Sequence, residues 1–107
     1  MWKPISINEL LDRISETEND LEGELVKFWK LVKIPPEKWQ EEEYGKDGGG
    51  FWVIGIYGKN VIWYNDIEEG FNVSKYNNYG LINNCAFEQY ELNQIVYQLY
   101  NSLITIS

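Results

Sequence analysis

The sequence predicts an α+β fold: an antiparallel β-meander of about four strands, with an N-terminal amphipathic helix and a C-terminal helix packed on it. Three observations lead to this prediction: apolar residues at helical spacing near both ends, aromatic and β-branched runs in the middle, and turn signals between those runs. A chain of 107 residues suffices for one hydrophobic core. We therefore expect a single globular domain over residues 1–107.

The first helix is predicted from Ile7 to Glu16. Ser6 followed three residues later by Glu9 fits a capping box, which marks a helix start. The apolar residues that follow lie on one helical face: Ile7, Leu10, Leu11 and Ile14. The tract 17–20 is polar and cap-like, and residues 22–24 add no apolar face, so we expect a break between helices in this region.

The next segment fits two structures. From Leu25 its apolar residues suit a helix, and some of them also suit a strand, so we favour a helix that gives way to extended chain near Leu31. Pro35 and Pro36 are expected to end either element. Proline at a first helical position predicts a short helical turn from Pro36 to Trp39, followed by a flexible loop at 45–50.

A β-hairpin is predicted in the middle of the chain. Residues 51–57 and 61–65 are rich in aromatic and β-branched side chains, and the three residues between them are turn-prone. The first of these strands is apolar on both faces. That pattern is expected either when both faces are covered within the protein or when one face is presented to a partner.

The meander is expected to continue through two further turns. Glu68-Glu69-Gly70 precedes a strand that begins at Phe71, and Asn77-Asn78 precedes a short strand at 79–82. A closing helix is predicted over residues 87–104 from apolar residues at helical spacing: Leu92, Ile95, Val96, Leu99 and Leu103.

Charge and composition restrict the partners. Seventeen acidic residues oppose nine basic ones, for a net charge of −8. This excess disfavours nucleic acid and anionic membranes, which both bind through lysine and arginine. No apolar run approaches the roughly 18 residues of a membrane span, and we see no secretion signal. The single cysteine, Cys85, is expected to be a buried thiol, and the protein is expected to be cytoplasmic.

Catalytic and cofactor motifs are not supported by the sequence. Without histidine the chain lacks the usual general base and metal ligand, and its glycines fit neither a Walker loop nor a dinucleotide fingerprint. Asp66 and Glu68 remain as paired carboxylates for a small hydrolase or lyase, alone or with a bound cation. We favour an ordinary polar turn at this point, and we expect no catalytic residue, no metal and no cofactor.

Acidic and aromatic residues instead indicate a protein-binding surface. Seventeen aromatic residues exceed the needs of a small core, and tyrosine and tryptophan are enriched at binding hot spots. Carboxylates would attract a basic partner and orient it. Candidate contacts lie near two turns: Trp39, Glu41, Glu42 and Glu43 near one, and Trp63, Tyr64, Asp66, Glu68 and Glu69 near the other. A structural subunit whose apolar faces are covered by a second copy is the further alternative.

About a third of the chain carries a resemblance. The segments are Pro36-Glu37-Lys38-Trp39, the tract GFWVIGIYG at 50–58 and the tract WYNDIEEGFN at 63–72. They resemble segments of small bacterial proteins, some of which accompany polymorphic or contact-dependent toxins as immunity proteins. The resemblance implies a protein that binds a toxin domain and blocks its active site without turnover. The acidic balance of the chain would suit a basic, nuclease-type toxin.

Overall fold

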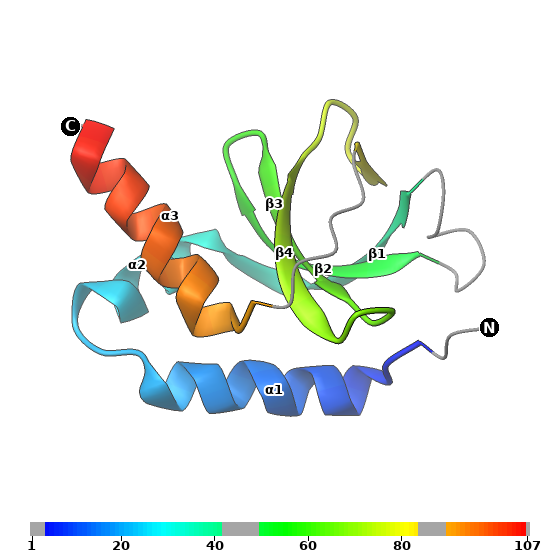
Figure 1. The fold of residues 1–107 in the computed structure, drawn as a ribbon, viewed down its shortest axis with the longest axis horizontal. Coiled ribbons are helices and arrows are strands. Elements are labelled where there is room, and N and C mark those ends of the chain that lie inside the picture. Colours follow the sequence, from blue (N-terminus) through cyan, green and yellow to red (C-terminus); the bar gives the residue numbers. More distant parts are fainter. Residues whose placement is uncertain (1–3, 42–49, 84–89, 107) are drawn as a thin grey trace.

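The computed structural model describes residues 4–41, 50–83 and 90–106, with side chains up to residue 103. In these ranges the chain forms three helices and a five-stranded sheet (Figure 1). The elements follow in the order α1 (Ile7–Asp20), α2 (Glu24–Val32), β1 (Lys33–Glu41), β2 (Phe51–Tyr57), β3 (Asn60–Asn65), β4 (Gly70–Lys75), β5 (Leu81–Ile82) and α3 (Leu92–Ile106). The α+β class predicted from the sequence is thereby confirmed.

The sheet has the strand order β4-β3-β2-β1-β5. Strands β1 to β4 form an antiparallel meander, and the hairpin between β2 and β3 turns at Gly58 and Lys59. The predicted meander began at Phe51, so β2, β3 and β4 were predicted as strands and β1 was not. Strand β5 does not continue the meander, because it crosses to the far edge and pairs in parallel with β1, Gln40 opposite Leu81. The sheet is therefore mixed, which the local sequence pattern could not predict.

All three helices share one hydrophobic core with one face of the sheet. Leu10 of α1, Trp29 of α2 and Ile95 of α3 are buried in the same cluster as Ile54 and Ile62 of the sheet. Figure 1 shows α1 running along the sheet, with α2 and α3 at one end of it. The α1 helix therefore has two long flanks, one on each side of its contact with the sheet.

A second core lies on the opposite face of the sheet. Trp39, Phe51, Val53 and Trp63 form a buried cluster there with residues of β3 and β5. Because successive side chains of a strand point to opposite faces of the sheet, the neighbouring residues Val53 and Ile54 are both buried, in different clusters. Strand β2 is apolar on both faces because both faces are covered within the protein.

Helix α1 begins as predicted and ends later. The Ser6 hydroxyl accepts a hydrogen bond from the N–H of Glu9 at 3.2 Å, as in a helix N-cap. The predicted helix end at Glu16 is too early, since the helix continues to Asp20 and ends where the N–H of Leu21 donates to the carbonyl of Thr17; the predicted break follows at residues 21–23. Tertiary contacts of this last turn outweigh its polar composition.

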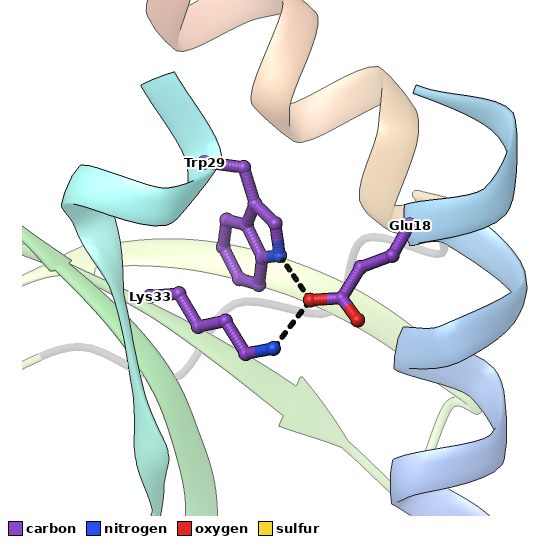
Figure 2. A network of polar contacts seen from close by, with 3 residues as sticks. All are labelled: Glu18, Trp29 and Lys33. Atoms are coloured by element: carbon purple, nitrogen blue, oxygen red, sulfur yellow. Dashed lines mark hydrogen bonds and ion pairs between the residues drawn. The ribbon is translucent and has the colours of Figure 1, made fainter. Parts of the chain in front are cut away.

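Glu18 makes those contacts (Figure 2). Its Oε2 atom accepts a hydrogen bond from the indole Nε1 of Trp29 at 2.8 Å and pairs with Nζ of Lys33 at 2.5 Å. Burial raises the pKa of Glu18, but the hydrogen bonds from Lys33 and Trp29 outweigh it, so the pKa lies below the ordinary 4.5. One carboxylate thus joins α1 to α2 and to the start of β1.

The two prolines do not end the chain's regular structure. The predicted helical turn from Pro36 to Trp39 is wrong, because these residues belong to β1. The pairing of β1 with β2 steps from Lys33–Gly55 to Glu37–Val53, so β1 carries extra residues at this point. Such a bulge on an outer stretch of strand tolerates prolines, which cannot donate to a ladder.

Some predictions fall partly outside the described residues. The closing helix is confirmed from Leu92, whereas Tyr90 and Glu91, predicted as helical, precede it; its predicted beginning at 87 lies outside the described residues, as do Cys85 and the loop at 45–49. Tyr90, just before α3, forms an isolated antiparallel bridge with Phe71. Within the described ranges, no helix combines the length and the apolar character needed to cross a membrane.

Candidate functional site

The turn between β3 and β4 presents the predicted carboxylates. Asn65 is buried, and its Oδ1 accepts hydrogen bonds from the N–H groups of Ile67 at 3.0 Å and Glu68 at 3.3 Å. Glu69 then adopts a left-handed conformation, with φ of 55°. An Asx turn of this kind fixes the loop locally, and it leaves the Glu69 side chain exposed.

Asp66 has a structural role at the start of this turn. Its Oδ2 atom accepts a hydrogen bond from the N–H of Ile5 at 2.8 Å, while the indole of Trp52 donates to the Ile5 carbonyl at 3.4 Å. Burial raises the pKa of Asp66, although the Ile5 N–H and the charge of Lys38 lower it in part. Asp66 thus holds the segment before α1 against the sheet.

The three aromatic residues predicted as contacts are buried instead. Trp39, Trp63 and Tyr64 are at most 1% exposed, so the prediction that they form exposed anchors is wrong. The indole of Trp63 donates to the Ser74 hydroxyl at 3.0 Å inside the second core. A curled sheet with a core on each face needs more large side chains than we assumed from the chain length.

The acidic cluster near Trp39 is not a described surface either. Glu41 is 2% exposed, so it cannot serve as a freely accessible contact. Glu42 and Glu43 lie outside the described residues. Of the predicted contact residues that the structure describes, only Asp66, Glu68 and Glu69 are brought together at an accessible place.

These three carboxylates line an open groove between α1 and the β3–β4 turn. It consists of two hollows of about 450 Å³ and about 320 Å³ that share Arg13, Tyr64 and Glu69. Most of the charged residues in the lining are carboxylates, which come from α1, from the turn and from the residue before α3. We call the two hollows together the acidic groove. Its charged residues are Glu9, Arg13, Glu16, Asp20, Asp66, Glu68, Glu69 and Glu91.

Among the described residues that line the acidic groove, Arg13 is the one basic residue. Its guanidinium lies over the ring of Tyr64, 5.3 Å from the ring centroid, which is a cation–π contact. Burial raises the pKa of Tyr64, and the charge of Arg13 lowers it only in part. The groove therefore already holds one cationic side chain on its aromatic floor.

Sequence reasoning missed the helical half of this groove. Glu9, Arg13, Glu16 and Asp20 follow one another at intervals of four, three and four residues, which places them on one face of a helix. That spacing was a readable signal, and α1 itself was predicted. The approach of this face to the turn at 66–69 and to Glu91 is a tertiary feature, which spacing does not reveal.

The chemistry of the groove is that of charge recognition. Among residues 4–41, 50–83 and 90–103, no group of three histidine, cysteine or carboxylate side chains is placed to hold a metal ion. Comparison with protein-family models, with curated proteins and with solved structures found no match for this chain. Oxygen acceptors on three separate elements suit ammonium and guanidinium groups.

Proposed function

We propose that this protein is a non-catalytic binding module whose acidic groove receives a basic segment of another protein. The observation that carries the proposal is the lining of the groove, where seven carboxylates from α1, the β3–β4 turn and the residue before α3 surround the single guanidinium of Arg13. Clefts lined by one sign of charge raise association rates by about 10- to 1,000-fold. A partner of opposite charge is therefore drawn to this face first.

The fold supports a rigid recognition surface. One wall is a helix of 14 residues whose buried side chains are fixed in the core, and the other is a turn held by the side chain of Asn65. A preformed site loses little conformational entropy when a partner binds. The protein needs no cofactor for such a role.

The finer version of the proposal is an immunity protein that binds and neutralises a basic, nuclease-type toxin domain in the cytoplasm. A nuclease holds nucleic-acid phosphates with lysine and arginine. The same side chains would be attracted to the carboxylates of the acidic groove. Binding there would occlude the toxin's substrate site, and the immunity protein itself would catalyse nothing.

The test is affinity capture from a nuclease-treated lysate of the source cell with two matched variants. The groove variant carries Glu16→Gln, Glu69→Gln and Glu91→Gln, three exposed positions on three elements. The control variant carries Asp12→Asn, Glu22→Gln and Glu24→Gln, which remove the same charge from exposed positions outside the groove.

We expect one basic protein to be retained by the wild type and by the control variant, and to be lost from the groove variant. Raising the salt concentration should release it, because exposed charges are screened. Equal retention by the groove variant and the control variant would remove the acidic groove from the interface. Identification of the retained protein as a toxin would support the proposal that this chain is an immunity protein, and any other identity would overturn it.

A further inference from the structure

A second hollow lies along the other flank of α1, and it is apolar. It has a volume of about 300 Å³ between α1 and the beginning of β1. We call it the apolar groove. Its apolar walls come from α1, α2, β1 and β2: Leu11, Ile14, Trp29, Ile34, Pro35 and Ile54.

The flank of α1 beside the apolar groove exposes residues that the helical pattern assigned to the core, of which Leu11 lines the groove. Leu10 and Ile14 are buried as expected, but Leu11 is 44% exposed, and Ile7, one turn before it, is 37% exposed. Burying an aliphatic side chain completely is worth roughly 1.5–3 kcal/mol of free energy relative to leaving it in water. This flank of α1 thus carries apolar surface that a partner could cover.

A polar group lines the same groove. Both donors to Glu18, from Trp29 and from Lys33, are bound by its Oε2 atom, and Figure 2 shows the second carboxylate oxygen directed away from them. No described residue donates a hydrogen bond to that second oxygen. This second oxygen of Glu18 is free to accept a hydrogen bond from an N–H group of an incoming segment.

We propose that the apolar groove receives one large apolar side chain of the same basic segment whose cationic side chains occupy the acidic groove. This inference rests on the proposed function and adds an anchor to it. Charge gives encounter and orientation, whereas affinity at interfaces comes mainly from a few side chains buried in well-packed pockets. The volume is near the lower end of the roughly 300–1,000 Å³ of small-molecule sites, which suits a single side chain.

Charge complementarity decides the occupant. Helix α1 separates the two grooves and carries five carboxylates against Arg13: Glu9, Asp12, Glu16, Glu18 and Asp20. A second copy of this chain, with its net charge of −8, would bring like charges together across α1. A segment with basic residues around one apolar residue complements both flanks of the helix.

The experiment uses two synthetic peptides and the ¹⁵N-labelled full chain. The first peptide is Arg-Lys-Trp-Lys-Arg with blocked ends, and the second has alanine in place of tryptophan and the same charge. The indole N–H of Trp29 reports on the apolar groove, because it donates to the Glu18 carboxylate in its lining. The indole N–H of Trp63, buried in the second core, is the internal control.

Both peptides should shift the amide resonances of Arg13 and Glu69, which report on the acidic groove. Only the tryptophan peptide should shift the Trp29 indole, and it should bind at least about tenfold more tightly, the equivalent of burying one large apolar side chain. The substitution Ser15→Trp, at an exposed position in the lining, should abolish that difference. Asn19→Trp adds the same side chain to α1 outside both grooves and should leave the difference intact.

The outcomes separate this inference from the proposed function. Equal binding of the two peptides with shifts at Arg13 and Glu69 would overturn the apolar anchor and keep the acidic groove. Failure of both peptides to shift any of these resonances would overturn both proposals. If uncharged N-acetyl-tryptophanamide alone shifted Trp29 as strongly as the tryptophan peptide, the apolar groove would be a small-molecule site and the anchor proposal would be wrong.

Discussion

Replacing Glu18 by alanine should destabilise the protein by about 2 kcal/mol, because one carboxylate joins three elements. The bond from the Trp29 indole at 2.8 Å is charge-assisted, and such hydrogen bonds contribute about 1.5–3 kcal/mol. The pair with Lys33 is partly exposed, with 43% and 31% of the two side chains accessible, so it adds only about 0.2–1 kcal/mol. Because Glu18 is partly exposed, we expect the two contributions together to lie in the lower half of their combined range.

Two further variants divide this effect between the two bonds. Glu18→Gln keeps an acceptor for Trp29 and loses the charge, so we expect a loss of about 1 kcal/mol or less. Lys33→Ala removes the ion pair alone and should cost about 0.5 kcal/mol. Asp12→Ala, at an exposed carboxylate of the same helix, is the matched control.

The assay is urea unfolding followed by far-ultraviolet circular dichroism, which does not depend on the emission of Trp29. The pKa of Glu18 is lowered in the folded state, so its contribution is present above the unfolded value of 4.5 and is lost as pH falls through the folded pKa. The deficit of Glu18→Gln should therefore shrink in acid. A free energy of unfolding for Glu18→Ala within about 0.3 kcal/mol of the Asp12→Ala control would refute this reasoning.

Two other predictions concern the backbone and pH. Gly50→Ala should destabilise the protein far more than Gly58→Ala in the same urea assay. Both glycines have positive φ, so the backbone strain of an alanine is common to the two variants. A Cβ at Gly50 would lie 2.4 Å from the carbonyl oxygen of Trp39, whereas a Cβ at Gly58 would meet nothing within 4 Å. Equal losses of stability in the two variants would contradict this prediction and show that β1 shifts easily near Trp39. Burial raises the pKa of Asp66 above 3.8, so the folded state binds its proton first, and the stability of the wild type relative to Asp66→Asn should rise as pH falls from neutral toward 3.8. A difference that does not change with pH would contradict this placement of Asp66.

Local features of the fold could be predicted from the sequence. The cap at Ser6 and the hairpin around Gly58 depend on residues within a few positions of each other, and both are present. The helical turn at Pro36 was predicted on equally local grounds and is wrong. A bulge in β1 tolerates the proline, and that bulge exists only through the long-range register with β2.

The aromatic residues show why exposure was harder to predict. Trp39 and Trp63 are far apart in sequence and share the second core. That core forms because the sheet curls and β5 returns to pair with β1, and neither feature is a local pattern. A count of aromatic side chains therefore overestimated how many would reach the surface.

About half of the candidate site could be predicted from the sequence. The turn carboxylates Glu68 and Glu69 were predicted and do face a groove. The facing wall follows from the helical spacing of Glu16 and Asp20, but only the packing of α1 against the sheet brings that wall to the turn.

The central claim is that the acidic groove binds a basic segment, and calorimetric titration with a short peptide of alternating lysine and arginine tests it most directly. Measurements at ionic strengths of about 0.01 M and about 0.15 M change the screening length from about 30 Å to about 8 Å. We expect one peptide to bind per chain at low salt, at least about tenfold more weakly at the higher salt and in the groove variant, with the control variant close to the wild type. Equal affinities of the groove variant and the control variant at low salt would contradict the account.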